Sequence, residues 1–360
     1  MAKSDEKKSQ LINIMNKTIL RLEGLATGVG SLPYQEADKA LDLIFKYLPE
    51  VPFWPQLPKR DIREGMTMQF SEGLPCLAAT PSGLVFNPRN REEELETFYS
   101  RVIASEVEHF GISPDFAQGF GRFMARLEDA NLKDVVALKC HITGPFTFAA
   151  SIKDEKGISL LHDEIMMQAI LKGLVMKALW QIRTLERFGK KIILFIDEPY
   201  LGCFGSAYTP INRQDVIRVL DELTGALCSD KVLVGVHCCG NTDWSIFTEA
   251  SGVDMISFDA FNFLERLVLY ARELGAFLER GGILCWGMVP TQDFSAKLTA
   301  DFLAERIKRG VADFAAKGMD QNLLLNSLFL SPSCGLGALE ESNAEPIFKL
   351  LQGLSRKFRK

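Results

Sequence analysis

Eight short apolar runs recur along this chain, and segments with helical periodicity separate most of them. A strand followed by a helix, repeated eight times, is the pattern of a (β/α)8 barrel. We therefore expect an α/β fold built as a single eight-stranded TIM barrel. The runs are LATGVGS (25–31), VPFW (51–54), VVALKCHI (135–142), KIILFI (191–196), VLVGVHC (232–238), DMISF (254–258), GILCWGMV (282–289) and LLLNSLF (323–329).

The spacing of these runs also predicts how the chain is divided. Residues 1–22 carry charges and only a broken apolar stretch, so we expect an N-terminal extension, and residues 23–360 are assigned to the barrel. Residues 57–130, between the second and third runs, are expected to form a mainly helical insertion. Residues 164–189 have apolar side chains at helical spacing and a glycine after the last turn, which predicts a helix. A two-domain, doubly wound enzyme is the alternative, although the glycine fingerprints of P-loop and dinucleotide sites are absent.

The composition favours a small-molecule substrate. The net charge is -5 and no dense stripe of lysine and arginine occurs, so neither a nucleic acid nor an anionic membrane is an expected partner. We find no signal peptide and no window near the roughly 20 apolar residues of a membrane span. Eight cysteines without an export signal predict reduced thiols in the cytoplasm, where unusual cysteine placement indicates a metal site or catalysis more often than disulfides.

Chemically active side chains follow four of the runs, at the end where a barrel carries its active site. Residues two apart on a strand share a face, so His237 and Cys239 can point into one site while Cys238 points away. Zn²⁺ prefers imidazole nitrogen, thiolate sulfur and carboxylate oxygen in tetrahedral sets. These residues are Asp197 and Glu198 after the fourth run, His237 and Cys239 at the fifth, Asp259 after the sixth and Cys334 after the eighth. The pattern predicts a zinc site of His237, Cys239 and Cys334, completed by a carboxylate or a substrate atom.

Each of these residues also has a simpler, purely structural interpretation. A lone cysteine at a strand end is more often a small buried hydrophobe than a ligand. An acidic pair before proline is a common turn, in which one carboxylate caps backbone amides. Next to a metal site, we expect Asp197 and Glu198 to act in catalysis, with Asp197 holding a substrate ammonium group and Glu198 supporting it. His141, at the exit of the third run, is open between a surface and a catalytic role.

Taken together, these residues resemble the C-terminal catalytic barrel of cobalamin-independent methionine synthase, in the superfamily that also holds uroporphyrinogen decarboxylases and corrinoid methyltransferases. The resemblance extends from about residue 25 to residue 340. Five separate motifs occur in the same order as in that family, which is more specific than any one match. The motifs are GVGSLP (28–33), HITGPFT (141–147), IDEP (196–199), HCC (237–239) and SPSCGL (331–336).

The resemblance implies roles for individual residues. It places zinc on His237, Cys239 and Cys334, and the amino group of homocysteine against Asp197. Val29 and Ser31 match positions that receive the amino-acid end of the substrate. The family's remaining zinc ligand is a glutamate, whereas this chain has Asp259 at the matching position. Because aspartate is one methylene shorter, direct ligation, ligation through water and a site with three protein ligands all stay open.

The resemblance further implies transfer of a methyl group to the thiol of homocysteine, giving methionine. The family enzyme has a histidine after the seventh strand that acts in proton delivery, but this sequence reads CWGMVPTQDF there and has no histidine after His237. The N-terminal barrel half of the folate-using enzymes is also missing from the sequence. Both differences point to a core-only methionine synthase whose donor is a methylcorrinoid or a corrinoid protein, with methyltetrahydrofolate as the alternative donor.

Three other functions are consistent with parts of the pattern. A zinc enzyme could methylate another thiol, such as coenzyme M. A metal-free enzyme similar to uroporphyrinogen decarboxylase needs a basic cleft, for which Arg60 and Arg63 are the nearest candidates. A non-catalytic module could bind a metal or a corrinoid without turnover. An ammonium group on the substrate distinguishes homocysteine from coenzyme M, because only the former gives Asp197 a cation to bind.

Overall fold

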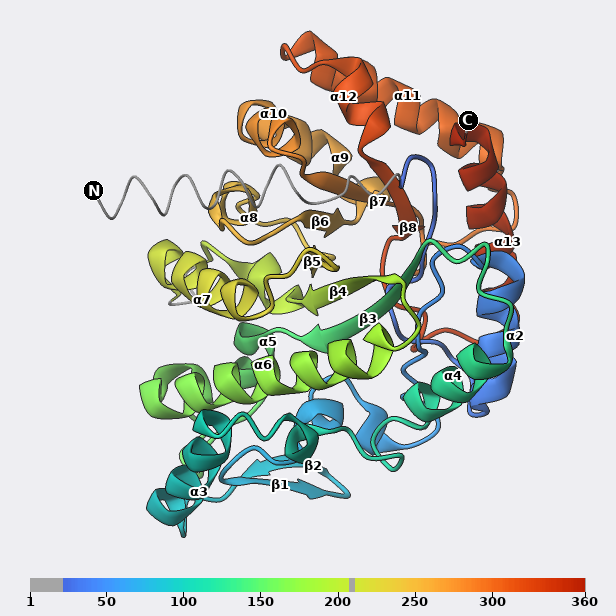
Figure 1. Cartoon of the computed structure of the whole chain (residues 1–360). Helices are drawn as coiled ribbons and strands as arrows, with labels where there is room; N and C mark the ends of the chain where they lie inside the picture. Colours follow the sequence, from blue (N-terminus) through green and yellow to red (C-terminus); the bar gives the residue numbers. More distant parts are fainter. Residues whose placement is uncertain (1–21, 207–210, 360) are drawn as a thin grey trace.

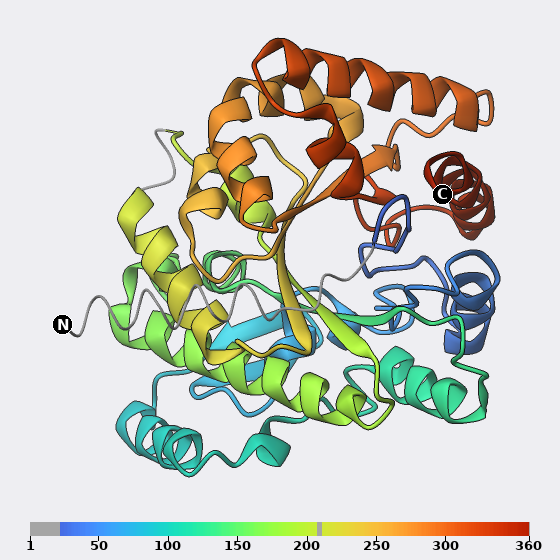
Figure 2. The ribbon, with the colours of Figure 1, turned by 45° about the horizontal axis from the view of Figure 1, so that its top comes forward.

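The structure is a computed structural model that describes residues 22–206 and 211–359. The expected N-terminal extension therefore lies outside the described residues, apart from Leu22. Six parallel strands form one sheet in the order β3-β4-β5-β6-β7-β8, and this sheet is curled into half of a barrel (Figures 1 and 2). The strands are β3 Ala137–Thr143, β4 Lys191–Asp197, β5 Val232–Cys238, β6 Met255–Phe258, β7 Ile283–Val289 and β8 Leu328–Pro332.

Helices follow each strand and lie outside the sheet (Figure 1). The helix predicted over 164–189 is confirmed as α6, which begins where the side chain of Asp163 accepts a hydrogen bond from the amide of Met166. Gly189, with a φ of 66°, follows its end. The helices are α2 Ala37–Tyr47, α3 Arg91–Ile103, α4 Gln118–Asp129, α5 Pro145–Ala150, α6 Glu164–Glu186, α7 Arg213–Ala226, α8 Ser245–Glu249, α9 Ala260–Leu267, α10 Ala271–Glu279, α11 Ala300–Ala316, α12 Gln321–Asn326 and α13 Glu341–Phe358.

The six strands bury side chains on both faces, as parallel strands covered by helices do. On β4, Ile192, Leu194 and Ile196 belong to the large core under the helices, while Ile193 and Phe195 belong to a separate cluster on the concave face. That cluster continues around the sheet through Ala137, Met255, Cys285 and Phe329. The alternation places the polar residues at the strand ends on the concave side, above an apolar floor.

The first two predicted runs do not form strands of the sheet. They make isolated parallel bridges instead: Ala26 pairs with Leu330 of β8, and Phe53 pairs with Lys139 of β3. A third bridge joins Ser31 to Gln56 and so connects the two segments to each other. Residues 25–31 contain two glycines, and residues 51–54 contain Pro52 and are followed by Pro55, so neither segment can sustain a long ladder of backbone hydrogen bonds.

The prediction of a strand over 323–329 is wrong for most of its length. Residues Gln321–Asn326 form helix α12, whose first amides are capped by the side chain of Asp320. The strand β8 begins at Leu328 and runs to Pro332. Three successive leucines are good helix formers, and a strong N-cap before them decides in favour of a helix.

The segment 57–130 contains the expected helices α3 and α4 and also a β-hairpin that the sequence analysis missed. Strands β1 Leu77–Thr80 and β2 Gly83–Phe86 pair in antiparallel fashion, with Thr80 opposite Gly83. Pro81 and Ser82 form the two-residue turn between them, which is a common turn composition. Figure 1 shows the hairpin beside α3, at the periphery of the fold.

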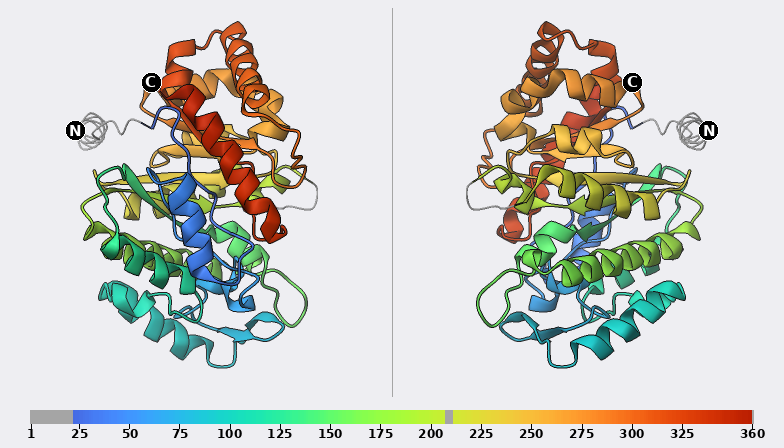
Figure 3. Two further views of the ribbon diagram at one scale, coloured as in Figure 1. Left: turned by 90° about the vertical axis from the view of Figure 1, so that its right-hand side faces the viewer. Right: turned by 90° about the vertical axis from the view of Figure 1, so that its left-hand side faces the viewer.

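The two ends of the described chain meet. Helix α13 lies against α2 and β8 (Figure 3), and the hydroxyl of Ser355 donates a hydrogen bond to the carbonyl of Gly24. We expected no segment resembling a membrane span, yet α6 is long and apolar enough to pass that test by length and composition. About two thirds (67%) of its most apolar window is buried in the structure, as is usual for a core helix.

Candidate metal centre

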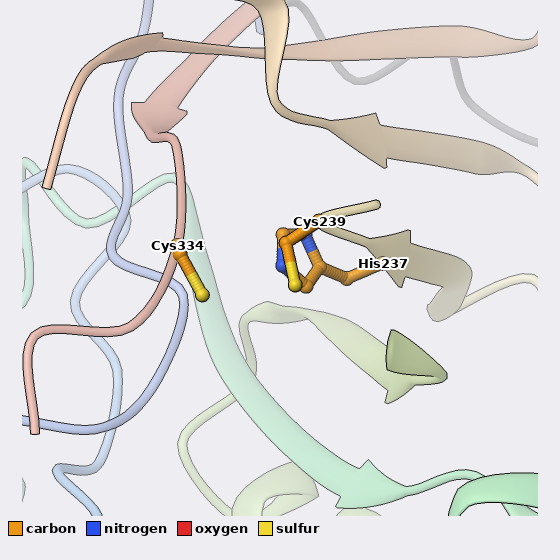
Figure 4. A group of neighbouring side chains, drawn as sticks. All are labelled: His237, Cys239 and Cys334. Carbon is orange, nitrogen blue, oxygen red and sulfur yellow. The ribbon is translucent and has the colours of Figure 1, made fainter. Parts of the chain in front are cut away.

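The structure brings together the three side chains that the sequence pattern assigned to zinc. His237 lies on β5, Cys239 directly after it, and Cys334 in the loop after β8 (Figure 4). One potential ligand atom from each residue lies within 4.8 Å of the others. Cys238 is fully buried in the core under the helices, on the opposite face of β5, as the alternation along a strand predicts. The cluster can therefore hold a metal ion through one nitrogen and two sulfur atoms.

His237 is oriented by a neighbour on the next strand. Its Nδ1 lies 2.9 Å from Oγ of Ser257, which is fully buried and pairs with His237 in the register of β5 and β6. Its Nε2 is buried and has no hydrogen-bond partner in the described part of the chain. With Nδ1 donating to Ser257, Nε2 carries the lone pair that a metal needs, an arrangement common among histidine ligands. Ser257, which the sequence analysis missed, is a serine inside an apolar strand two residues before Asp259.

The thiols of Cys239 and Cys334 influence each other's protonation. Their mutual hydrogen bond lowers the pKa of Cys334 to about 4 and raises the pKa of Cys239 well above its ordinary value. Burial opposes the charge on either sulfur, while the nearby His237 favours a thiolate at Cys334. The shift favours a thiolate at Cys334, and the thiolate is the form that binds metals.

The loop that carries Cys334 is held from two sides. On one side, the amide of Ser333 donates to the carbonyl of Val289 at the end of β7, at 2.8 Å. On the other, the amide of Leu336 donates to the carbonyl of Ser31 at 2.9 Å. A Cβ atom at Gly335 would lie 2.2 Å from Oγ of Ser31, so only glycine permits this approach. The motifs SPSCGLG and GVGSLP, about 300 residues apart, therefore lie against each other.

Asp197 lies beside the cluster with one oxygen atom unpaired. It ends β4, pairs with His237 in the strand register, and is buried. Its Oδ1 has no hydrogen-bond partner among the described residues. Burial raises the pKa of Asp197 to about 6, although His237 and Lys139 lower it. A buried, unpaired carboxylate next to a potential metal site is suited to bind a cationic group.

Glu198 has a different environment from that of Asp197. It accepts hydrogen bonds from the amides of Phe146 and Thr147, at 2.9 and 2.8 Å, and from the hydroxyl of Thr147 at 2.6 Å. Burial raises its pKa to about 7. Both of its oxygen atoms thus cap the start of α5, which is the competing interpretation of the acidic pair. Its predicted catalytic role stays a prediction, and the contacts assign it to supporting the loop that follows Asp197.

The carboxylate of Asp259 is not part of the group of potential ligand atoms that lie within 4.8 Å of one another. Its carboxylate accepts hydrogen bonds from the backbone and side-chain nitrogens of Asn262, at 3.0 and 2.8 Å, and caps α9. Burial raises its pKa, and both Cys334 and His237 are close enough to affect it electrostatically. Zinc ligation by Asp259 therefore stays a prediction, and it would compete with the helix cap.

The segment predicted to hold the substrate is fixed by a buried lysine. Nζ of Lys139 donates to the carbonyl of Val29 at 2.5 Å and lies 4.6 Å from the centre of the Phe195 ring. Burial lowers the pKa of Lys139 to about 8. Lys139 is not among the residues that the sequence pattern predicts for the site, although a lysine inside the apolar run VVALKCHI is a visible signal. Val29 is buried and Ser31 partly buried, and the carbonyl of Ser31 accepts a hydrogen bond from the Cys334 loop.

No model of a known protein family matches this chain, and no curated protein matches it. The site must therefore be interpreted from its own chemistry. Among the described residues, the cluster offers one imidazole nitrogen and two thiols, a donor set that can bind a metal ion.

Proposed function

We propose that this protein is a zinc-dependent methyltransferase that moves a methyl group to the thiol of homocysteine and forms methionine. The observation that carries the proposal is the cluster of His237, Cys239 and Cys334, in which the buried Nε2 of His237 has no partner within the described chain. Asp197, beside this cluster, adds a carboxylate that can recognise an amino acid. The resemblance to the catalytic barrel of cobalamin-independent methionine synthase agrees with this arrangement.

Zinc is the metal that fits this donor set best, because thiolate and imidazole ligands suit it and its tetrahedral geometry leaves one position for a substrate sulfur. When bound, the ion supplies Lewis-acid chemistry that lowers the pKa of a coordinated thiol. His237, Cys239 and Cys334 would hold it, and Ser257 would keep the imidazole in the required orientation.

The remaining residues bind and orient the acceptor. Asp197 accepts hydrogen bonds from its ammonium group, and the segment containing Val29 and Ser31 receives its carboxylate end. Lys139 holds the carbonyl of Val29 in place. Fixing a thiol in line with a methyl donor can lower the barrier by several kcal/mol, on the order of 7 or more when the alignment is good.

We extend the proposal to the barrel itself. Residues 25–31 and 51–54 would occupy the positions of the first two strands and close the six-stranded sheet into an eight-fold barrel. The bridges of Ala26 with Leu330, Ser31 with Gln56 and Phe53 with Lys139 support this, since together they connect β8 to β3 through the two segments. Closure would place GVGSLP at the same mouth as the metal cluster.

The donor in this proposal is a methylcorrinoid or a corrinoid protein, with methyltetrahydrofolate as the alternative, and the setting is the cytoplasm. A methyl-cobalt donor releases a reduced cobalt centre and needs no proton, whereas the folate nitrogen must be protonated as methyl leaves. Apart from His237 and His141, the histidines of the chain are His109 and His162, which lie in short 3-10 turns in and after the 57–130 segment. Neither lies beside the cluster.

The competing functions have less support. Arg60 and Arg63, the nearest candidates for a basic cleft, pair with Glu64 and with Asp61 and Asp115, respectively. These pairs leave little free positive charge for the several carboxylates of a porphyrinogen. In a coenzyme M methyltransferase, the unpaired oxygen of Asp197 would have no substrate cation to bind. A binding module without turnover would not need this unpaired oxygen.

The first test is the metal content of the purified protein beside that of a Cys239→Ser, Cys334→Ser double variant. We expect about one zinc per chain in the parent protein and none in the double variant. Cys238→Ser is the matched control, because that thiol is adjacent in sequence but faces the helices; this variant should keep its zinc.

Methyl transfer is then measured with homocysteine and either methylcobalamin or methyltetrahydrofolate. Formation of methionine that depends on the bound metal supports the proposal. Absence of metal after anaerobic purification with zinc supplied, or bound metal without methyl transfer from either donor, would remove it.

A further inference from the structure

A second buried histidine lies outside the metal cluster and has no assigned role. His141 is on the same face of β3 as Lys139 and Thr143, and Thr143 pairs with Asp197 in the register. Its side chain is buried, with a relative exposure of 2%. Neither ring nitrogen has a hydrogen-bond partner in the described chain. A buried imidazole with two unpaired nitrogens makes the folded state less stable than an apolar side chain of similar shape would. Its presence is therefore better explained by a function than by packing.

The ring of His141 is held in one orientation by its surroundings. Trp54 stacks on it with 4.1 Å between ring centres and an angle of 17°, and Phe70 meets it edge-on at 6.1 Å. Nε1 of Trp54 donates to the side chain of Gln181 at 2.9 Å, and the same side chain donates to the backbone carbonyl of His141 at 3.0 Å. The fold thus fixes the ring and its strand through buried hydrogen bonds while leaving the ring nitrogens unpaired.

One face of the His141 ring, near the carbon between its two nitrogens, lies against the segment predicted to bind the substrate. A Cβ atom built on Gly30 would lie 3.1 Å from Cε1 of His141, 3.3 Å from Nδ1 and 3.4 Å from Nε2. Gly30 stands between Val29 and Ser31, the two residues expected to receive the amino-acid end. His141 is therefore a direct neighbour of that segment.

The groups around His141 favour an anionic ligand. The carbonyls of Val29, Gly30 and Ser31 already accept hydrogen bonds within the chain, from Lys139, Gln56 and Leu336. Lys139, two residues before His141 on the same face, places positive charge nearby. Burial and Lys139 keep the pKa of His141 well below its ordinary value, so the imidazole is neutral and offers one N–H donor. The group that is free to bind a ligand in this region is therefore a hydrogen-bond donor. A carboxylate is a ligand that accepts hydrogen bonds from such a donor.

We infer that His141 is a substrate-recognition residue whose imidazole N–H binds the α-carboxylate of the amino-acid thiol. This inference rests on the proposed function and refines it: Asp197 would bind the ammonium group and His141, with Ser31, the carboxylate. The site would then select a thiol that carries both charged groups of an α-amino acid.

The test compares His141→Phe with the parent protein, using homocysteine and 3-aminopropane-1-thiol, which lacks the carboxylate. Phenylalanine keeps the stack on Trp54 and removes both nitrogens. We expect the KM for homocysteine to rise about 10- to 100-fold, the size of a lost hydrogen bond to a charged group, with little change for 3-aminopropane-1-thiol. Zinc content should stay at about one per chain and the Tm should not fall. His141→Gln keeps an N–H donor and should recover part of the affinity.

Ile142→Val, on the other face of β3, controls for a general disturbance of the strand. An equal rise in KM for both thiols, or no rise, would overturn the inference and leave the proposed function intact. If the parent protein transfers no methyl group, the proposed function fails, and calorimetry on zinc-loaded protein still decides the inference. A loss of homocysteine binding in His141→Phe with unchanged binding of 3-aminopropane-1-thiol supports it, and absence of homocysteine binding to the parent overturns it.

Discussion

Nδ1 of His237 lies 2.9 Å from Oγ of Ser257, and the two residues face each other across the parallel strands β5 and β6. The hydroxyl is fully buried, and the other nitrogen of the imidazole is left unpaired within the described chain. The pair determines which nitrogen of His237 can bind a metal. Ser257, which is not part of the cluster, thus orients one of the side chains of the candidate site.

Ser257→Ala should weaken zinc binding about 10- to 100-fold, because the imidazole loses the partner that orients it. Competition with a chromophoric chelator measures the affinity. Ser331→Ala is the matched control, since Ser331 is also fully buried near the mouth but bonds the carbonyl of Pro332. Equal zinc affinities of the two variants would contradict the orienting role of Ser257.

Asp197→Asn should raise the KM for homocysteine about 10- to 100-fold, since it removes the charge that pairs with the ammonium group. The zinc content should not change, because Asp197 is outside the ligand cluster. Steady-state kinetics with homocysteine and with 4-mercaptobutyrate, which has the same carbon chain and carboxylate but no ammonium group, separates the effect. A KM that stays at the parent value would favour an acceptor such as coenzyme M.

The contribution of Asp197 and Glu198 to the stability of the metal-free protein should fall as the pH rises from about 4 to 7. Burial raises the pKa of Asp197 to about 6 and that of Glu198 to about 7, from ordinary values of 3.8 and 4.5. In this window these two carboxyl groups hold more protons in the folded state than in the unfolded state, so their contribution to the free energy of unfolding decreases with pH. For Asp197 alone, a difference of about two pKa units corresponds to about 3 kcal/mol.

Asp197→Asn should therefore be more stable than the metal-free parent at pH 7, with a difference that shrinks toward pH 4. Denaturation midpoints at several pH values, measured with a chelator present, check this. Parallel pH profiles for both proteins would show that Asp197 does not cause the decrease.

Gly144→Ala should destabilise the protein by about 1–3 kcal/mol, as overpacking of a core does. A Cβ atom there would lie 2.2 Å from the carboxyl carbon of Glu198, which caps α5. Displacement of Glu198 should also lower activity through the adjacent Asp197. Gly121→Ala is the control: Gly121 lies inside α4 with nothing within 4 Å of a new Cβ, so alanine should raise stability by up to about 1 kcal/mol. Similar thermal shifts in both variants would argue against the steric explanation.

The hydrophobic pattern of the sequence correctly predicted most strands of the sheet. Apolar runs predicted five of the six strands closely, and β5 spans Val232–Cys238 as expected. The alternation of side chains correctly separated His237 and Cys239 from Cys238. Where local signals conflict, the prediction is wrong: the leucines before Leu328 form a capped helix, and residues 77–86, in a segment predicted to be mainly helical, form a β-hairpin.

The site could be predicted only in part, for a physical reason. Asp197 and Glu198 are adjacent in sequence and chemically alike, yet alternation turns one toward the cluster and the other onto the amides of α5. Asp259 matched a ligand position in the sequence but caps α9 in the structure. Ser257, Lys139 and His141 carry no motif of their own; they become notable only through burial and through the partners that they have or lack.

The sequence by itself therefore determined the α/β class, the succession of strands and helices, and the residue types at the strand ends, because these depend on hydrophobic periodicity within short windows. The tertiary structure alone decided which strand ends meet. Sheet order and register place Cys334 within 4.8 Å of His237 and Cys239, about 95 residues earlier, and bring GVGSLP against the Cys334 loop. Such contacts arise from the packing of elements far apart in the chain, which no local pattern specifies.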